Sequence, residues 1–126
     1  MPIQAVWNTD TYATAVHTGV ITFQEMMDFH LQLPSDPRWE ILQHALSDWR
    51  RVERIIATED ELKLLAVHLS VYDLTLNKLR LALVPGQYEN AIEYGNLFVA
   101  EMAKYETEVK MLPTIDEAEH WLFNED

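Results

Sequence analysis

The chain has 126 residues, of which 48% are hydrophobic and 24% are charged. These values are typical of globular proteins and exclude a disordered or fibrous chain, so the length predicts one domain over residues 1–126. Nine Lys and Arg against 21 Asp and Glu give a net charge of −12, which disfavours nucleic acid as a partner. The absence of cysteine excludes disulfides, thiolate metal sites and cysteine nucleophiles.

Apolar runs are too short for membrane insertion, and the first residues lack the basic start and hydrophobic stretch of a leader. We therefore expect a cytoplasmic protein. Residues 3–16 predict a β-hairpin, because Ile3, Ala5 and Trp7 alternate with polar residues and a turn follows at residues 8–10. Residues 12–16, which are rich in Thr and Val, would form the second strand.

Three capping boxes, each a threonine followed three residues later by a glutamate, predict three helix starts. They pair Thr22 with Glu25, Thr58 with Glu61, and Thr114 with Glu117. The expected helices cover residues 23–33, 58–77 and 114–123, and an apolar stripe with helical spacing predicts another over residues 88–105. Gly95 lies on that stripe and would allow close approach to the layer beneath.

Short apolar segments at residues 41–46, 79–84 and 109–112 separate the helices and are predicted to be strands. Strands that alternate with helices indicate right-handed crossovers and a mainly parallel sheet. The predicted fold class is therefore α/β, with a mixed sheet of about five strands, an N-terminal antiparallel hairpin and about four helices.

A search for catalytic and ligand-binding motifs predicts no enzyme, no metal site and no cofactor. The five histidines, at positions 17, 30, 44, 68 and 120, lack the spacing that places two ligands on one helical face, although His30 and His68 could meet in space. Three glycines are too few for a phosphate-binding loop, and no serine lies in a nucleophile elbow. Acidic residues 59–61 begin a helix, where the helix dipole already gives them a structural use.

The order of these elements resembles the STAS and SpoIIAA-like fold, and it looks closest to small stand-alone bacterial proteins of that fold. The likeness covers residues 7–122. It is carried by Gly19-Val20-Ile21-Thr22 at the end of the hairpin, by the strand that leads into Ser47-Asp48, by Arg80-Leu81-Ala82-Leu83-Val84, and by the closing segment from Ile115 to Leu122.

The resemblance implies a non-enzymatic regulatory or protein-binding module, and we expect it to form a homodimer. Anti-sigma antagonists of the family carry a phosphorylatable serine, preceded by aspartate, at the start of the helix that follows the central strand. Here the corresponding residues are Ala57-Thr58-Glu59-Asp60. The missing serine argues against a direct sigma-factor role. Thr58 could be modified by position, but helix capping is its expected duty.

The expected binding surface is a loop from Asp48 to Thr58 together with the neighbouring turn at residues 85–87. This loop holds three of the nine cations beside a tryptophan that we expect to be exposed, and Arg and Trp are enriched at interface hot spots. The alternative is a solvated loop whose arginines pair with nearby acids. The candidate partner-binding residues are Asp48, Trp49, Arg50, Arg51, Arg54, Thr58, Pro85 and Gly86.

A second hypothesis is a carrier of a small apolar or amphipathic ligand. The first helix has apolar residues on both faces, and aromatic residues are frequent early in the chain. The residues concerned are Met26, Met27, Phe29, Leu31 and Leu33 on the helix, and the aromatics Trp7, Tyr12, Phe23 and Trp39. The alternatives for the helix are a dimer seam or burial beneath the loop that contains Pro34, Pro37 and Trp39.

Overall fold

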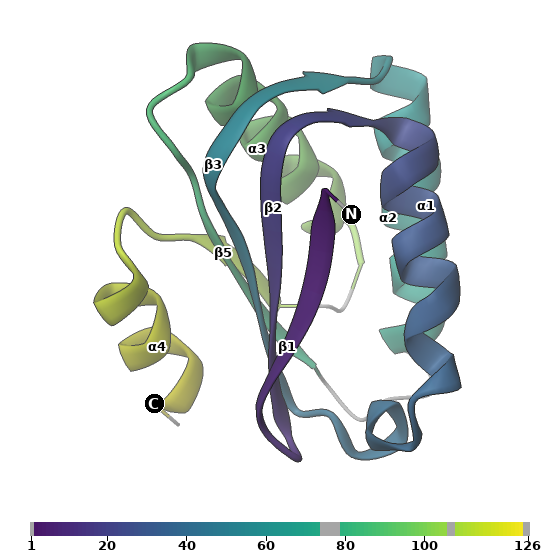
Figure 1. The fold of residues 1–126 in the computed structure, drawn as a ribbon, viewed down its shortest axis with the longest axis vertical. Helices are drawn as coiled ribbons and strands as arrows, with labels where there is room; N and C mark the ends of the chain where they lie inside the picture. Colours follow the sequence, from purple (N-terminus) through teal and green to yellow (C-terminus); the bar gives the residue numbers. More distant parts are fainter. Residues whose placement is uncertain (1, 74–78, 106–107, 125–126) are drawn as a thin grey trace.

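The protein forms a five-stranded sheet with helices on both faces, in a computed structural model that describes residues 2–73, 79–105 and 108–124 (Figure 1). The elements are β1 (Ile3–Thr9), β2 (Tyr12–Thr22), α1 (Phe23–Gln32), the 3-10 turns η1 (Leu33–Ser35) and η2 (Pro37–Ile41), β3 (His44–Ile56), α2 (Glu59–Asp73), β4 (Arg80–Val84), α3 (Glu89–Met102), β5 (Glu108–Met111) and α4 (Ile115–Phe123). The strand order is β1-β2-β3-β4-β5. Only β1–β2 is antiparallel, which confirms the predicted α/β class with a mainly parallel sheet.

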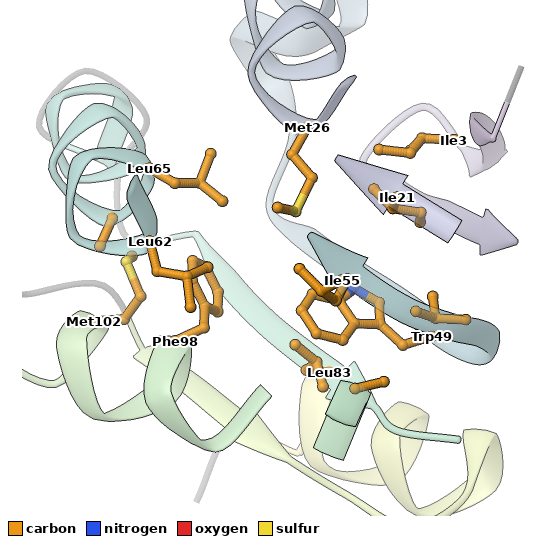
Figure 2. Packing of buried hydrophobic residues seen from close by; sticks show 13 residues of the cluster. Ile3, Ile21, Met26, Trp49, Ile55, Leu62, Leu65, Leu83, Phe98 and Met102 are labelled. Carbon is orange, nitrogen blue, oxygen red and sulfur yellow. The ribbon is translucent and has the colours of Figure 1, made fainter. Parts of the chain in front are cut away.

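Three helices cover one face of the sheet and one helix covers part of the other. Met26 of α1, Leu62 and Leu65 of α2, and Phe98 of α3 meet the inner face of the sheet around Trp49 of β3 (Figure 2). On the outer face, α4 packs on the first half of β3 and on β4, which builds a second cluster that includes Leu46, Ala82, Val84, Ala118 and Leu122. α4 also reaches the start of β2, where the Tyr12 hydroxyl donates to the Glu119 carboxylate at 3.0 Å. Among the described elements, no helix covers the outer face of β1, the rest of β2 and the second half of β3 (Figure 1).

The three predicted helix starts are confirmed. At α1 the Thr22 hydroxyl accepts a hydrogen bond from the Glu25 N–H, and the Thr22 N–H donates to the Glu25 carboxylate. Thr58 and Glu61 make the same reciprocal pair at α2, and the Thr114 hydroxyl caps α4. The predicted end of α2 at residue 77 lies outside the described residues. No helix of the described chain is long and apolar enough to cross a membrane.

The third predicted strand is present, but its predicted bounds are wrong. We expected a strand over residues 41–46 and a loop from Asp48 to Thr58, but η2 ends at Ile41 and β3 runs from His44 to Ile56. Two register shifts against β2, between Val16 and Thr18 and again between Gly19 and Val20, each add one residue to β3. These β-bulges remove the period of two that identifies a strand in the sequence.

The bulges turn every third residue of β3 toward the core. Trp49, Val52 and Ile55 are exposed by only 4%, 0% and 1%, although a regular strand would place residues 49 and 52 on opposite faces. Trp49 is thus buried, so its predicted exposure is wrong. Its indole N–H donates to the Ser47 hydroxyl at 2.8 Å, so the one polar group of the buried indole has a hydrogen-bond partner.

Candidate functional site

Three arginines lie along the exposed side of β3, and we call them the arginine strip: Arg50, Arg51 and Arg54. The bulges place them between the buried anchors, so they project from the strand while Trp49, Val52 and Ile55 enter the core. Within the described chain, no carboxylate lies within ion-pair distance of Arg51 or Arg54. Arg51 and Arg54 therefore have exposed guanidinium groups with no ion-pair partner among the described residues, on a protein of net charge −12.

Arg50 differs from the other two arginines because it is bound to Asp48. Its Nε and Nη2 donate to the two carboxylate oxygens at 3.0 Å each, and its backbone N–H donates to Oδ1 at 3.1 Å. Burial raises the pKa of Asp48, but the hydrogen bonds from Arg50 outweigh it and hold that pKa below its ordinary value. The predicted pairing of arginines with nearby acids thus holds for one of the three.

The surface around the strip is the part of the sheet that α4 leaves uncovered. In the β2–β3 register Arg51 lies opposite Thr18 and Arg54 opposite Val20. Val20 is 49% exposed. The strip is therefore bordered by an apolar and a hydroxyl side chain on an open sheet face. A partner could pair with its charges and also bury apolar surface there.

The turn at Pro85 and Gly86 lies beside the strip, as the sequence predicted. A methyl group added at Gly86 would lie 2.7 Å from the backbone oxygen of Arg50 and 3.0 Å from that of Trp49. Only glycine allows the turn to approach β3 this closely, because a Cβ would collide with backbone that cannot rotate away. The turn and the arginines of β3 thus belong to one surface, although the Trp49 side chain faces the interior.

Thr58 lies at the exposed start of α2, two residues beyond the end of β3. Its hydroxyl accepts from the Glu61 N–H at 3.1 Å, and its N–H donates to the Glu61 carboxylate at 2.8 Å. The Glu61 carboxylate therefore already accepts a hydrogen bond from a free N–H group at the helix start, and Glu59 and Asp60 add further negative charge. An external anion would meet these three acids, so the geometry favours capping as the duty of Thr58.

Two α3 side chains that sequence reasoning missed fix the position of the strip. The Asn90 side-chain oxygen accepts from the Ile55 N–H at 2.8 Å, and the Tyr94 hydroxyl donates to the Ala57 carbonyl. Both bonds tie α3 to the end of β3, close to the second bulge. An asparagine and a tyrosine on a helix are too common to have signalled this, because their partners are backbone atoms more than 30 residues away.

A cavity of about 80 Å³ lies between α1, α2 and the inner face of the sheet. Its walls are mainly apolar and aromatic, and three of the four tryptophans contribute: Trp7, Trp39 and Trp49. Among the described residues, the polar side chains in its lining are Thr14, Ser47, His17 and His30, and no carboxylate is present. The aromatic residues that suggested a ligand pocket thus do surround a hollow, except Tyr12 and Phe23, which are not part of its lining.

His17 and His30 meet this cavity from β2 and α1. The Nδ1–H of His17 donates to the Ala15 carbonyl at 3.0 Å, and its ring lies 5.7 Å from that of Trp49. Burial lowers the pKa of His17 to about 4. Burial, followed by the neighbouring His17 and His68, lowers the pKa of His30 to about 3, and Nδ1 of His30 is buried without a hydrogen-bond partner. Both imidazoles are therefore neutral at pH 7.

The described part of the chain contains no group of three or more His, Asp and Glu side chains arranged to hold a metal ion. His30 and His68, from α1 and α2, do come close enough to influence each other electrostatically, as the sequence suggested. These histidines belong to the interior around the cavity, so the arginine strip and the cavity are two separate candidate sites on opposite sides of the sheet.

Comparison with known proteins identifies the fold. No family model matches the chain, and no curated protein matches it. Among solved structures, a crystal structure of an uncharacterized protein of the DUF3478 family from Shewanella loihica PV-4, described as having a SpoIIAA-like fold, is similar with a TM-score of 0.58. It is 21% identical in sequence, over 95% of this chain and 91% of that one. The chain therefore has a SpoIIAA-like fold.

Proposed function

We propose that this protein is a non-enzymatic, cytoplasmic binding module that regulates a partner protein by holding one of its acidic segments on the arginine strip. The observation that carries the proposal is the pair of exposed guanidinium groups of Arg51 and Arg54, with no ion-pair partner among the described residues, on an uncovered sheet face. Arginine forms bidentate hydrogen bonds with carboxylates, so an acidic segment is the complementary occupant.

The flanking surface supports the same occupant. Val20 offers exposed apolar area beside the charges. Gly86 and Asn90 hold β3 in place, so the sheet requires little reorganisation on binding. A SpoIIAA-like fold is consistent with a regulatory or binding role.

Charge reversal tests the strip. In an NMR titration of the ¹⁵N-labelled protein with acetylated hexaglutamate at low salt, amide shifts are expected along residues 50–54 and at Thr18 and Val20. The double variant Arg51→Glu with Arg54→Glu should weaken binding by at least about tenfold, because two attractive contacts become repulsive. Added NaCl should weaken binding by the wild type as well.

A matched control separates local charge from net charge. The variant Lys63→Glu with Lys110→Glu also changes two exposed cations into anions, so each double variant moves the net charge from −12 to −16. This control should bind acetylated hexaglutamate with an affinity within about threefold of that of the wild type. Equal losses in the two double variants, or amide shifts away from β3, would contradict the proposal.

The cavity supports a second candidate, a carrier of a small apolar or amphipathic molecule. At about 80 Å³ it is smaller than the roughly 150 Å³ engineered cavity that binds benzene, so a hydrocarbon chain needs more room. Phe29 and Leu33 of the α1 region form a wall shared with an outer hollow of about 400 Å³. Displacement of the Phe29 ring would join the two spaces.

Native mass spectrometry of protein purified without detergent tests the carrier. A discrete adduct that leaves on acid denaturation is expected, together with a change in tryptophan fluorescence on its removal, because three tryptophans line the cavity. Substitution of Trp121, which lies outside the cavity on α4, should leave that fluorescence change intact. Bare protein in every preparation would exclude the carrier and leave the arginine strip unaffected.

A further inference from the structure

The two edges of the sheet are protected differently. β5 has four residues, two of which, Glu108 and Lys110, are charged, and Glu108 is paired with Arg80 at 2.8 Å. Short length and charge are the usual means by which a protein prevents pairing at a sheet edge. β1 has seven residues, Ile-Gln-Ala-Val-Trp-Asn-Thr, with no charge and no proline. β1 is thus an edge without these protections.

The backbone of β1 offers a set of hydrogen-bonding groups on its open side. The Thr18 N–H donates to the Pro2 carbonyl at 2.8 Å, and the register pairs Ile3 with His17 and Ala5 with Ala15. In an antiparallel ladder, residues alternate between those bonded to the partner strand and those whose N–H and C=O point away. Ile3, Ala5 and Trp7 therefore direct their N–H and C=O groups outward, away from β2.

A groove runs beside this open side, between β1 and α1. Two hollows of about 400 and 150 Å³ share Ile3, Phe29 and Gln32, so they adjoin each other along the strand. Leu33 and Trp7 add apolar walls at one end. A strand added to β1 would direct every second side chain into this groove, where apolar groups would be covered.

The charge of the groove determines which occupant it suits. Glu25 and Asp28 line the end near Ile3, and no lysine or arginine is among the described residues that line either hollow. Asp36, at the other end, is already paired with Arg38. Because two acids and no cation line the end near Ile3, a partner segment with a basic side chain at this end would compensate Glu25 and Asp28.

We propose that the β1 edge binds an extended segment of a partner protein, antiparallel to β1, by strand addition. The segment places alternate apolar side chains in the groove over Phe29 and Leu33 and a lysine or arginine beside Glu25 and Asp28. This surface is distinct from the arginine strip, because it depends on backbone groups of the sheet edge and on acids of α1.

The probe is the capped peptide Lys-Thr-Val-Thr-Val-Thr-Lys, which as a strand presents both valines and both lysines on one face. In NMR titrations of the ¹⁵N-labelled full chain, amide shifts are expected at Ile3, Ala5 and Trp7. The counterpart with glutamate in place of each lysine should bind at least fivefold more weakly. Asp28→Asn should weaken the basic peptide about two- to fivefold, while Glu93→Gln, the same charge loss on the exposed side of α3, should not.

Methylation of the peptide tests strand addition without altering the protein. In the antiparallel arrangement, residues that face the groove donate their N–H groups to β1, and the threonine N–H groups point away. N-methylation of both valines should therefore reduce affinity at least tenfold, whereas N-methylation of two threonines should change it less than threefold. Equal effects of the two methylations, shifts confined to other elements, or concentration-dependent self-association through β1 would each overturn the proposal.

Discussion

Acidification from pH 7 to pH 4.5 is expected to lower the free energy of unfolding by about 2.5 kcal/mol through His17 alone, with a loss of similar size through His30. Burial holds the pKa of His17 at about 4 and that of His30 at about 3 in the folded protein, against 6.5 for an exposed imidazole. Between these values the unfolded chain binds protons that the folded chain does not. Stability is therefore complete above about pH 6.5 and is lost as the pH falls.

Urea denaturation between pH 7 and pH 4.5 measures this loss of stability. Asp36 and Asp48 have lowered pKa values, so their contribution to the pH dependence falls mainly below this range. The variant His30→Leu removes one titrating group and should flatten the slope by about 1.4 kcal/mol per pH unit. His120→Leu is the matched control, since His120 is exposed on α4. A wild-type stability that does not change with pH in this window would contradict the burial of both imidazoles.

Truncation of Trp49 is expected to be the most damaging single substitution on β3. Trp49→Ala should lower the free energy of unfolding by about 3–5 kcal/mol, because the indole is 4% exposed and packs among residues from all three inner helices. The loss is a large part of the roughly 5–15 kcal/mol that stabilises a domain. Urea unfolding followed by circular dichroism measures it without relying on the removed fluorophore.

Two further variants test the contribution of the Trp49 hydrogen bond and of its central position in the core. Trp49→Phe keeps an aromatic ring but loses the 2.8 Å hydrogen bond to Ser47, so it should cost less than Trp49→Ala. Trp7→Ala removes the same side chain from a partly buried position on the edge strand and should also cost less. Equal losses for Trp7→Ala and Trp49→Ala would mean that residue 49 is not the central core position described.

Local signals predicted the helices and the order of the elements correctly. A capping box depends on four consecutive residues, so the bonds of Thr22 with Glu25 and of Thr58 with Glu61 follow from sequence alone. The hairpin and the strand at residues 80–84 were also evident from their patterns. Parallel order then followed from the alternation of strands and helices.

The part of the fold that could not be predicted is the second half of β3. Each bulge depends on how β3 pairs with β2, a strand about 30 residues earlier, and nothing in residues 48–56 encodes that partner. A spacing of three between Trp49, Val52 and Ile55 matches neither a regular strand nor a continuous helix, so a loop was the natural prediction.

The candidate sites were likewise predicted only in part from the sequence. The closeness of the three arginines to Gly86 was predicted by placing both after the ends of adjacent strands, and it holds although the arginines lie within β3 and only Gly86 follows a strand end. The cavity was not located, since His17 and His30 are thirteen positions apart and meet only when α1 folds back over β2. A histidine in a sequence does not reveal whether its ring will be buried.

The two bulges of β3 also separate the residues that determine folding from those that determine recognition. A regular strand places one outward residue between successive inward ones, whereas two outward residues separate Trp49 from Val52 and two separate Val52 from Ile55. The outward pairs can change sign or size during evolution while the inward anchors hold the strand in register. Related proteins could therefore acquire different partners through this strand without a cost to the stability of the domain.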